Sequence, residues 1–174
     1  MRKICYCVAM SLDGYIAGPN GEYDWITMDP EIDFAAMMQR FDALIMGRKT
    51  LEMTRAMHGA GGVGMPGIRS YVVSTTLKQD DYPDVKIINT MLLEELNAIR
   101  REPGKDIWLF GGGILFKSLL AIRQVQSVEV AIVPVLLGGG IPLLPAPASR
   151  HQLKCVKSRT YQKSGIQAIE YQVI

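Results

Sequence analysis

Three consecutive glycines at positions 111–113 constrain this chain more than any other feature of its sequence. Residues 107–110, just before them, form a short apolar run that is typical of a strand buried on both faces. Beyond them, apolar residues recur at helical spacing over 114–120. A strand, a glycine turn and a helix start together allow close backbone approach to a phosphate and offer it free N–H groups. The sequence therefore predicts a phosphate-binding turn, although a tight turn without a ligand would use the same glycines.

Composition limits the classes of protein to which the chain can belong. Its 174 residues, 48% of them hydrophobic, suit one domain with a real core, and a net charge of +2 gives no basic field for nucleic acid. Three cysteines without framework spacing favour a reducing compartment. Ser11 and Asp13 interrupt the first apolar run, and Glu129 and two prolines interrupt the apolar stretch at 128–144. We therefore expect a single cytoplasmic domain, residues 1–174, that binds neither nucleic acid nor a membrane.

Strand-like and helical segments alternate along the chain. We expect strands at 3–10, 42–47, 69–75, 85–88, 107–110 and 127–133, and helices at 30–41, 48–57, 91–101 and 114–120. Loops rich in glycine or proline are expected at 11–23, 59–67 and 134–147, and an antiparallel hairpin at 152–161 and 166–174. This pattern predicts an α/β fold in three layers, with a mostly parallel twisted sheet, helices on both faces and a C-terminal antiparallel hairpin.

A second strand–glycine–helix junction follows the strand at 42–47. Gly47, Arg48, Lys49 and Thr50 stand there, but the upstream glycine of a nucleotide-triphosphate loop is missing. Two such junctions in one sheet would suit the two ends of a dinucleotide. An ordinary exposed helix start is the alternative.

Hydroxyl side chains end the next strand. Ser74 and Thr75, near the cations of the second junction, suit the 2′-phosphate that distinguishes NADP from NAD. A simple turn is the alternative. Residues 11–17, which include Gly14, permit a loop that folds over a bound ring.

Five motifs occur in order along the chain: SLDGYIA at 11–17, DALIMGRKTLE at 42–52, VVST at 72–75, FGGG at 110–113 and PVLLGGGIPL at 134–143. Together they resemble the dihydrofolate reductase superfamily. The branch that they resemble more closely contains the reductase domain of the bifunctional riboflavin-biosynthesis deaminase-reductase. The resemblance implies this superfamily's fold, NADPH as the cofactor and a homodimer.

The resemblance also implies a role for each matching residue. The positions that it assigns to the cofactor are Ala9 and Ile16 beside the nicotinamide, Gly47, Arg48, Lys49 and Thr50 at the adenosine-side phosphates, Ser74 and Thr75 at the 2′-phosphoribose, and Gly111, Gly112, Gly113, Ile114 and Leu115 at the pyrophosphate.

The substrate side is less well defined. By resemblance, Glu31, Asp33 or a bound water would supply a proton, but acids in a first helical turn also serve as dipole partners. Asp13, Trp25 and Phe116 are assigned to the substrate, with a buried loop anchor as the alternative for Trp25. Where riboflavin reductases carry an arginine- and threonine-rich segment for the sugar phosphate, this chain has a glycine-rich one.

These expectations combine into an NADPH-dependent reductase that transfers hydride to a pyrimidine- or pterin-type heterocycle, resembling 5-amino-6-(5-phosphoribosylamino)uracil reductase. Two alternatives stay open: dihydrofolate reductase activity, and a non-catalytic NADP(H)-binding module. No metal is expected, because Cys5 and Cys7 share one strand face but no second pair of ligands has suitable spacing.

Overall fold

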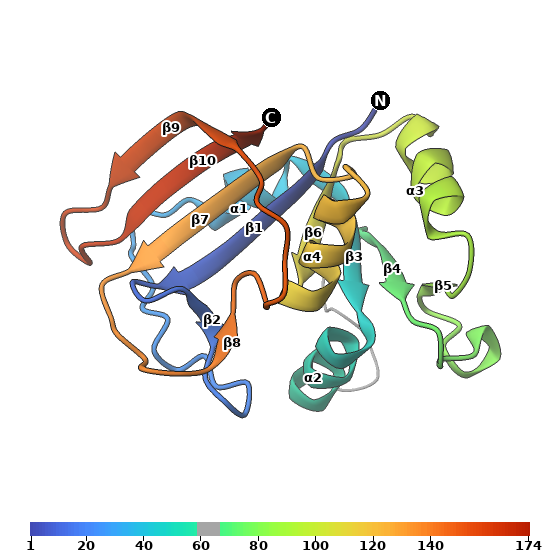
Figure 1. The fold of residues 1–174 in the computed structure, drawn as a ribbon, viewed down its shortest axis with the longest axis horizontal. Coiled ribbons are helices and arrows are strands. Elements are labelled where there is room, and N and C mark those ends of the chain that lie inside the picture. Colours follow the sequence, from blue (N-terminus) through green and yellow to red (C-terminus); the bar gives the residue numbers. More distant parts are fainter. Residues whose placement is uncertain (59–66) are drawn as a thin grey trace.

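The computed structural model describes residues 1–58 and 67–174 of the chain. Within these residues, two sheets and four α-helices are present (Figure 1). The large sheet contains β1 (Ile4–Ser11), β3 (Phe41–Gly47), β4 (Arg69–Val73), β5 (Lys86–Ile88), β6 (Asp106–Gly111), β7 (Ser127–Val133), β9 (Leu153–Thr160) and β10 (Gln167–Val173). The small sheet pairs β2 (Tyr15–Ala17) with β8 (Ile141–Pro142). The helices are α1 (Phe34–Met38), α2 (Arg48–His58), α3 (Leu92–Arg101) and α4 (Gly113–Ala121), and a 3-10 turn, η1 (Gln79–Asp81), precedes β5.

The large sheet confirms the expected α/β fold. Its strand order is β5-β4-β3-β6-β1-β7-β10-β9, and every neighbouring pair from β5 to β7 is parallel. The C-terminal hairpin then adds β10 antiparallel to β7, and β9 antiparallel to β10. Strand β1 lies inside the sheet between β6 and β7, as its apolar sequence requires.

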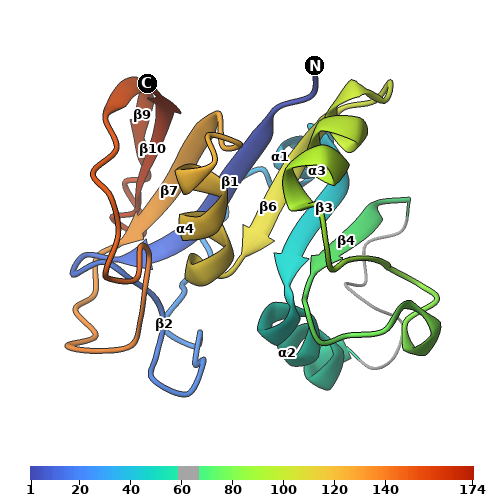
Figure 2. The ribbon, with the colours of Figure 1, turned by 45° about the vertical axis from the view of Figure 1, so that its right-hand side comes forward.

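Helices cover both faces of this sheet, because successive side chains of each strand point to opposite sides. In β1, Ile4 and Tyr6 belong to the core beneath α3 and α4, whereas Cys5 and Cys7 belong to the core on the other face. Met37 of α1 packs against that second core. Figure 2 shows α3 and α4 in front of the sheet and α1 behind it.

The order of the strands reverses between β1 and β6. From β1 the chain passes through α1 to β3 on one side, and from β6 it passes through α4 to β7 on the other. The β1–β6 ladder ends at the pair Tyr6–Leu109, although both strands continue. Where the strands part, the indole N–H of Trp108 donates to the carbonyl of Cys7 at 3.0 Å. In open α/β sheets, ligands bind at such a reversal, outside the carboxyl ends of the strands.

Three expectations about the chain before and after the sheet were wrong. The helix expected over 30–41 begins at Phe34, because Asp29 contacts the C-terminal hairpin rather than capping a helix. Phe41, expected on that helix, is the buried first residue of β3. The two expected loops, 11–23 and 134–147, pair with each other through β2 and β8. The glycine-rich loop expected at 59–67 lies outside the described residues, except for Gly67.

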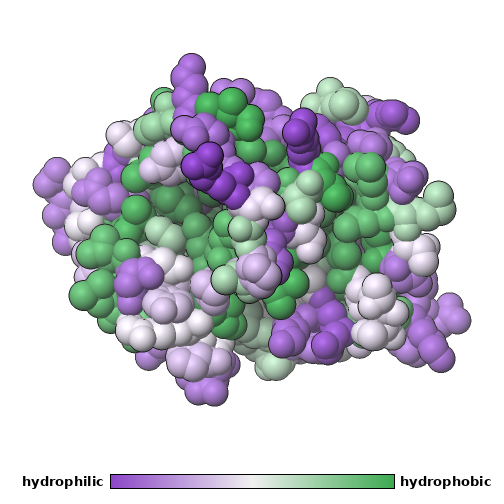
Figure 3. All heavy atoms as spheres, in the orientation of Figure 1, coloured by the Kyte–Doolittle hydropathy of each residue, from purple (hydrophilic) through white to green (hydrophobic). Residues whose placement is uncertain are grey.

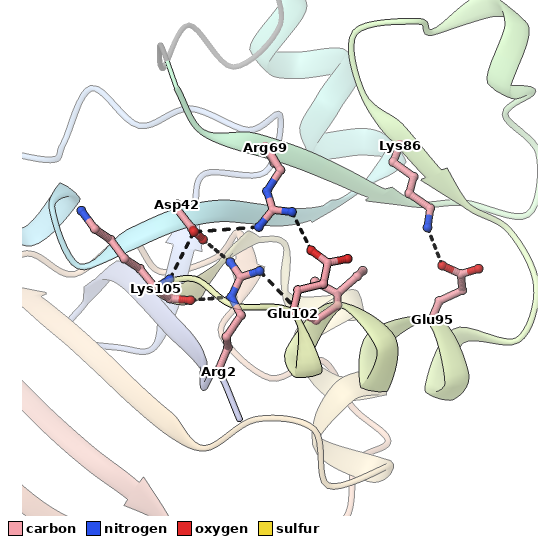
Figure 4. A network of polar contacts seen from close by, with 8 residues as sticks. Arg2, Asp42, Arg69, Lys86, Glu95, Glu102 and Lys105 are labelled. Atoms are coloured by element: carbon pink, nitrogen blue, oxygen red, sulfur yellow. Dashed lines mark hydrogen bonds and ion pairs between the residues drawn. The ribbon is translucent and has the colours of Figure 1, made fainter.

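The opposite end of the sheet is held by a polar network (Figure 4). The buried guanidinium of Arg2 pairs with Asp42 of β3 and donates to the carbonyl of Lys105. Arg69 lies 2.6 Å from Glu102, so β4 is joined to the end of α3. Figure 3 shows the face that carries α3 and α4, where polar side chains surround apolar ones that reach the surface. The network fastens the amino ends of β3 and β4 to the start of the chain and to the end of α3.

Candidate functional site

The two strand–glycine–helix junctions lie side by side. Strands β3 and β6 are neighbours, paired up to Met46 and Gly111, and each continues directly into its helix. Thr50, on the first turn of α2, reaches the other junction: its Oγ1 lies 3.6 Å from the point where a Cβ would stand on Gly111 or on Gly112. The structure therefore brings together Thr50 and the glycine turn, which the sequence places far apart.

The three glycines of the turn are required for different reasons. Gly111 has φ +152°, a conformation that other residues rarely adopt. A Cβ on Gly113 would lie 2.6 Å from the carbonyl oxygen of Pro142, so packing against the segment around β8 excludes any side chain there. Gly112 has an ordinary extended backbone (φ −101°, ψ −168°), and its nearest neighbour to an added Cβ is Thr50 at 3.6 Å. Neither the φ and ψ of Gly112 nor its packing excludes a side chain, so the space in front of it is open to the close approach of a ligand.

The remaining cofactor candidates on this side differ in their surroundings. Arg48 forms an exposed ion pair with Glu52 at 2.7 Å, one helical turn away. Lys49 is exposed and has no ion pair among the described residues. The side chains of Ile114 and Leu115 diverge on α4: Ile114 is exposed, and Leu115 is buried in the core. Exposed ion pairs are weak, so a phosphate would readily replace Glu52 as the partner of Arg48.

Ser74 and Thr75 follow β4 directly. The buried hydroxyl of Ser74 accepts from the backbone N–H groups of Thr76 and Leu77 at 3.2 and 3.1 Å, so it holds a turn. Thr75 is exposed. The simple-turn alternative therefore accounts for Ser74, and only Thr75 of this pair presents itself to solvent.

A cavity of about 380 Å³ lies on the face of the sheet that carries α1. Its apolar wall includes Ala9, Met37, Trp108 and Ile166, and its charged groups include Glu31 and Asp33. Three residues predicted from the sequence, Ala9, Glu31 and Asp33, thus meet in one cavity. Its size and largely apolar lining with a few polar groups are typical of small-molecule sites.

The two candidate proton donors have different partners. Asp33 caps α1, since its carboxylate accepts from the N–H of Ala36 at 2.8 Å. Glu31 is exposed and lies 3.3 Å from Arg159 of the hairpin strand β9. Glu31 is therefore the carboxylate with more freedom to act on a bound molecule.

Asp29 positions the segment that carries these acids. Its buried carboxylate accepts from the N–H of Glu31 at 2.8 Å and from the N–H of Ser164 at 3.1 Å. The Ser164 side chain and these backbone N–H groups lower the pKa of Asp29. One carboxylate thereby ties the loop before α1 to the turn between β9 and β10. A sequence reading cannot detect this contact, because it joins positions 135 residues apart.

Sequence reasoning also missed an ion pair in the cavity wall. Both terminal nitrogens of Arg40 donate to the carboxylate of Glu129, at 2.7 and 2.6 Å, and this pairing raises the pKa of the guanidinium. The alternation of side chains along β7 was the signal that could have located Glu129. It places Glu129 on the same face of the sheet as Cys7 of β1.

The residues assigned to the substrate lie elsewhere. Asp13 accepts from the Ser11 hydroxyl and from the N–H groups of Leu137 and Gly138, which lowers its pKa and ties the first loop to the loop after β7. Trp25 is half-buried, and its indole N–H donates to the Glu22 carbonyl at 3.1 Å.

Phe116, the third of these residues, packs inside the core. Its ring stacks on Tyr6 with centroids 4.0 Å apart, and only 3% of the residue is exposed. Ile16 lies half-buried in β2, next to β8. The structure thus separates Asp13, Trp25 and Phe116 from the lining of the cavity.

The cysteines of β1 are buried thiols. Burial raises the pKa of Cys5 to about 11 and raises that of Cys7 as well. Among residues 1–58 and 67–174, no group of three or more metal-binding side chains is arranged to hold an ion. In the same part of the chain, the helices are too short or too polar to cross a bilayer.

Relatives of known sequence cover almost the whole chain. The protein YyaP of Bacillus subtilis (strain 168) is 32% identical over 185 residues, covering 97% of this chain and 94% of that protein. YwjB of the same organism is 29% identical, covering 82% of each.

Solved structures share the fold. A Shewanella sp. PV-4 protein described as a candidate for riboflavin biosynthesis superposes with a TM-score of 0.80 at 28% identity, covering 100% of this chain and 99% of the other. The Thermotoga maritima deaminase/5-amino-6-(5-phosphoribosylamino)uracil reductase gives 0.72 at 17% identity, over 99% of this chain and 57% of that one. Dihydrofolate reductase from Enterococcus faecalis, complexed with NADP(H), gives 0.66 at 16% identity, over 98% and 94%. The family model of the RibD C-terminal domain matches residues 2–166, and the chain therefore belongs to that family.

Proposed function

We propose that this protein is an NADPH-dependent reductase that acts on a small heterocyclic substrate. The observation that carries the proposal is the adjacency of the two strand–glycine–helix junctions, joined by Thr50, beside the reversal of strand order. This is the place where α/β sheets bind dinucleotides. Reductases among the structural neighbours support the reaction type.

The residues at the junctions fit a dinucleotide. Gly112 leaves room for a phosphate at the start of α4, which is nine residues long and begins with free N–H groups. Gly47 leaves similar room, since an added Cβ would meet only Leu115, at 3.9 Å. Arg48, Lys49 and Thr75 supply the cations and the hydroxyl for the phosphates on the adenosine side, including the 2′-phosphate. When bound, NADPH supplies the hydride.

The cavity beneath α1 fits the substrate. Ala9, near the carboxyl end of β1, lines this cavity. Strand β1 is one of the two strands between which the strand order reverses, so the cavity borders the reversal point. Trp108 provides an aromatic wall, and Glu31 provides a carboxyl group for proton delivery. The protein's contribution is to hold the heterocycle, to exclude water and to present Glu31.

Steady-state oxidation of NADPH, followed at 340 nm with a panel of heterocycles, tests this function. The panel contains dihydrofolate and aminouracil nucleosides and nucleotides. We expect turnover with at least one member and a loss of rate in Glu31→Gln. Binding of NADPH without turnover of any member would instead support a non-catalytic NADP(H)-binding module, and turnover confined to dihydrofolate would define a dihydrofolate reductase.

A further inference from the structure

The charges that line the cavity balance one another. Three cations and four carboxylates face it: Arg40, Lys157 and Arg159, with Glu31, Asp33, Glu129 and Glu170. Each cation lies opposite a different carboxylate: Arg40 faces Glu129, Arg159 faces Glu31, and Lys157 faces Glu170. Asp33 is the one carboxylate without a cation opposite it in the cavity lining. The cavity therefore has no surplus of positive charge with which to attract an anion.

Arg40 is the most firmly committed of the cations. It binds Glu129 through two parallel hydrogen bonds of 2.7 and 2.6 Å, the geometry in which a guanidinium would otherwise bind a phosphate. Its guanidinium also lies over the ring of Phe41, 5.2 Å from the centroid. A phosphate would have to displace Glu129 and would then remain beside it.

The two cations of β9 also have carboxylates beside them, one through a direct contact and one through the strand register. Arg159 lies 3.3 Å from Glu31 and stacks over Tyr161, with the guanidinium carbon 4.5 Å from the ring centroid. Lys157 stands directly across from Glu170 in the β9–β10 register, so both side chains lie on the cavity face.

The junction assigned to the cofactor has the opposite balance. Arg48 and Lys49 stand there in sequence, and Glu52 pairs with Arg48 alone. The same molecule thus offers surplus positive charge to a phosphate at the junction and none in the cavity. This contrast distinguishes the two sites by the charge of the molecule that each accepts.

We infer that the cavity takes a heterocycle that carries no phosphate and that presents amino or amide N–H groups. A phosphate brings about 1.5 to 2 negative charges, and a lining with one more carboxylate than cations offers no surplus positive charge to offset them. Carboxylates only accept hydrogen bonds when ionised, so Glu31, Asp33 and Glu170 suit N–H donors on the ring. The inference rests on the proposed function, because it assigns the substrate to the cavity and the phosphates of the cofactor to the junctions.

Calorimetric titration of the full chain with an aminouracil ribonucleoside and with its 5′-phosphate tests the inference. We expect the nucleoside to bind at least about fivefold more tightly than the nucleotide, since one unfavourable exposed charge contact has about that effect. In Glu31→Gln, which releases Arg159, the preference should shift towards the nucleotide by about fivefold. Glu94→Gln, a change of the same charge at an exposed position of α3, is the matched control and should shift nothing.

Three results would overturn the inference. One is tighter binding of the nucleotide than of the nucleoside by the wild-type chain. If the cavity binds the phosphate, the higher affinity for the nucleotide is lost in Arg159→Gln and kept in Lys154→Gln, which changes a lysine of β9 outside the cavity. Another is that NADPH binds but neither the nucleoside nor the nucleotide does. The proposed reductase function would then remain possible, and the substrate class inferred here would be wrong. The third is failure of NADPH itself to bind, which refutes the proposed function and takes this inference with it.

Discussion

Replacing Gly112 with alanine separates a glycine kept for a ligand from one kept for the fold. The added Cβ would lie 3.6 Å from Thr50 Oγ1, an ordinary contact, and the backbone there is extended. Gly112 is also the N-cap of α4, where alanine is less favourable than glycine, so we expect the free energy of unfolding to fall by no more than about 1 kcal/mol. The methyl group would occupy the space that a phosphate needs to reach the N–H groups of the turn.

The expected loss of affinity follows from the hydrogen bonds involved. One hydrogen bond to a charged group contributes about 1.5–3 kcal/mol, so losing one at Gly112 should weaken NADPH binding by about 10- to 150-fold. Thermal unfolding monitors stability, and fluorescence titration with NADPH monitors affinity. Gly139→Ala is the control, since an added Cβ there meets nothing within 4 Å. A Gly112→Ala protein that binds NADPH within twofold of wild type would show that no phosphate contacts the turn at this position.

Four further predictions follow from contacts elsewhere in the molecule. Glu31→Gln should lower kcat/KM for an accepted substrate by about 100-fold and leave NADPH affinity unchanged; equal activity would remove Glu31 from the mechanism. Asp29 has a lowered pKa, so its contribution to stability is present above about pH 4 and is lost as the pH falls through the lowered value. Asp29→Asn should therefore flatten the acid limb of a stability–pH profile and raise KM, whereas an unchanged profile would contradict its role. Arg2→Met leaves the Asp42 carboxylate without its buried partner and should cost about 2–3 kcal/mol by urea unfolding, with NADPH affinity unaltered (Figure 4). The resemblance implies a homodimer, and the exposed edge strand β9 would suit one, so light scattering should give twice the mass of one chain; a monomer would contradict this expectation.

The elements that carry strong local signals were predictable. The apolar run at 107–110 became β6, the glycines became its turn, and the alternating C-terminal segments became β9 and β10. Each signal depends on residues close together in the chain, so periodicity and turn chemistry were enough.

The elements that depend on distant contacts were not predictable. Asp29 and Pro30 look like a helix start, but the carboxylate of Asp29 bonds the turn at Ser164, and α1 begins four residues after Pro30. The pairing of β2 with β8 likewise joins segments more than 100 residues apart. Tertiary contacts of this kind override local preference and leave no trace in either segment alone.

The site was predictable in part for the same reason. The glycine junctions can be recognised from the local sequence. In the structure they are neighbours, and Thr50 of one junction contacts the glycine turn of the other. Arg40, Glu129 and Trp108 of the cavity carry no local motif, because their meeting depends on strand order and register. Phe116 was assigned to the substrate by resemblance. Its ring stacks on Tyr6 in the core, and its assignment to the substrate stays a prediction.

A paired equilibrium titration of the wild-type protein with NADPH and NADH decides whether the two glycine junctions bind a nicotinamide dinucleotide. The two nucleotides differ only in the 2′-phosphate, so their affinity ratio isolates the cations of the second junction. We expect saturable binding of both, with NADPH tighter by about tenfold or more, as one charge-assisted contact would give. Absence of binding by either nucleotide would contradict this expectation, because the adjacent glycine turns would then be only turns.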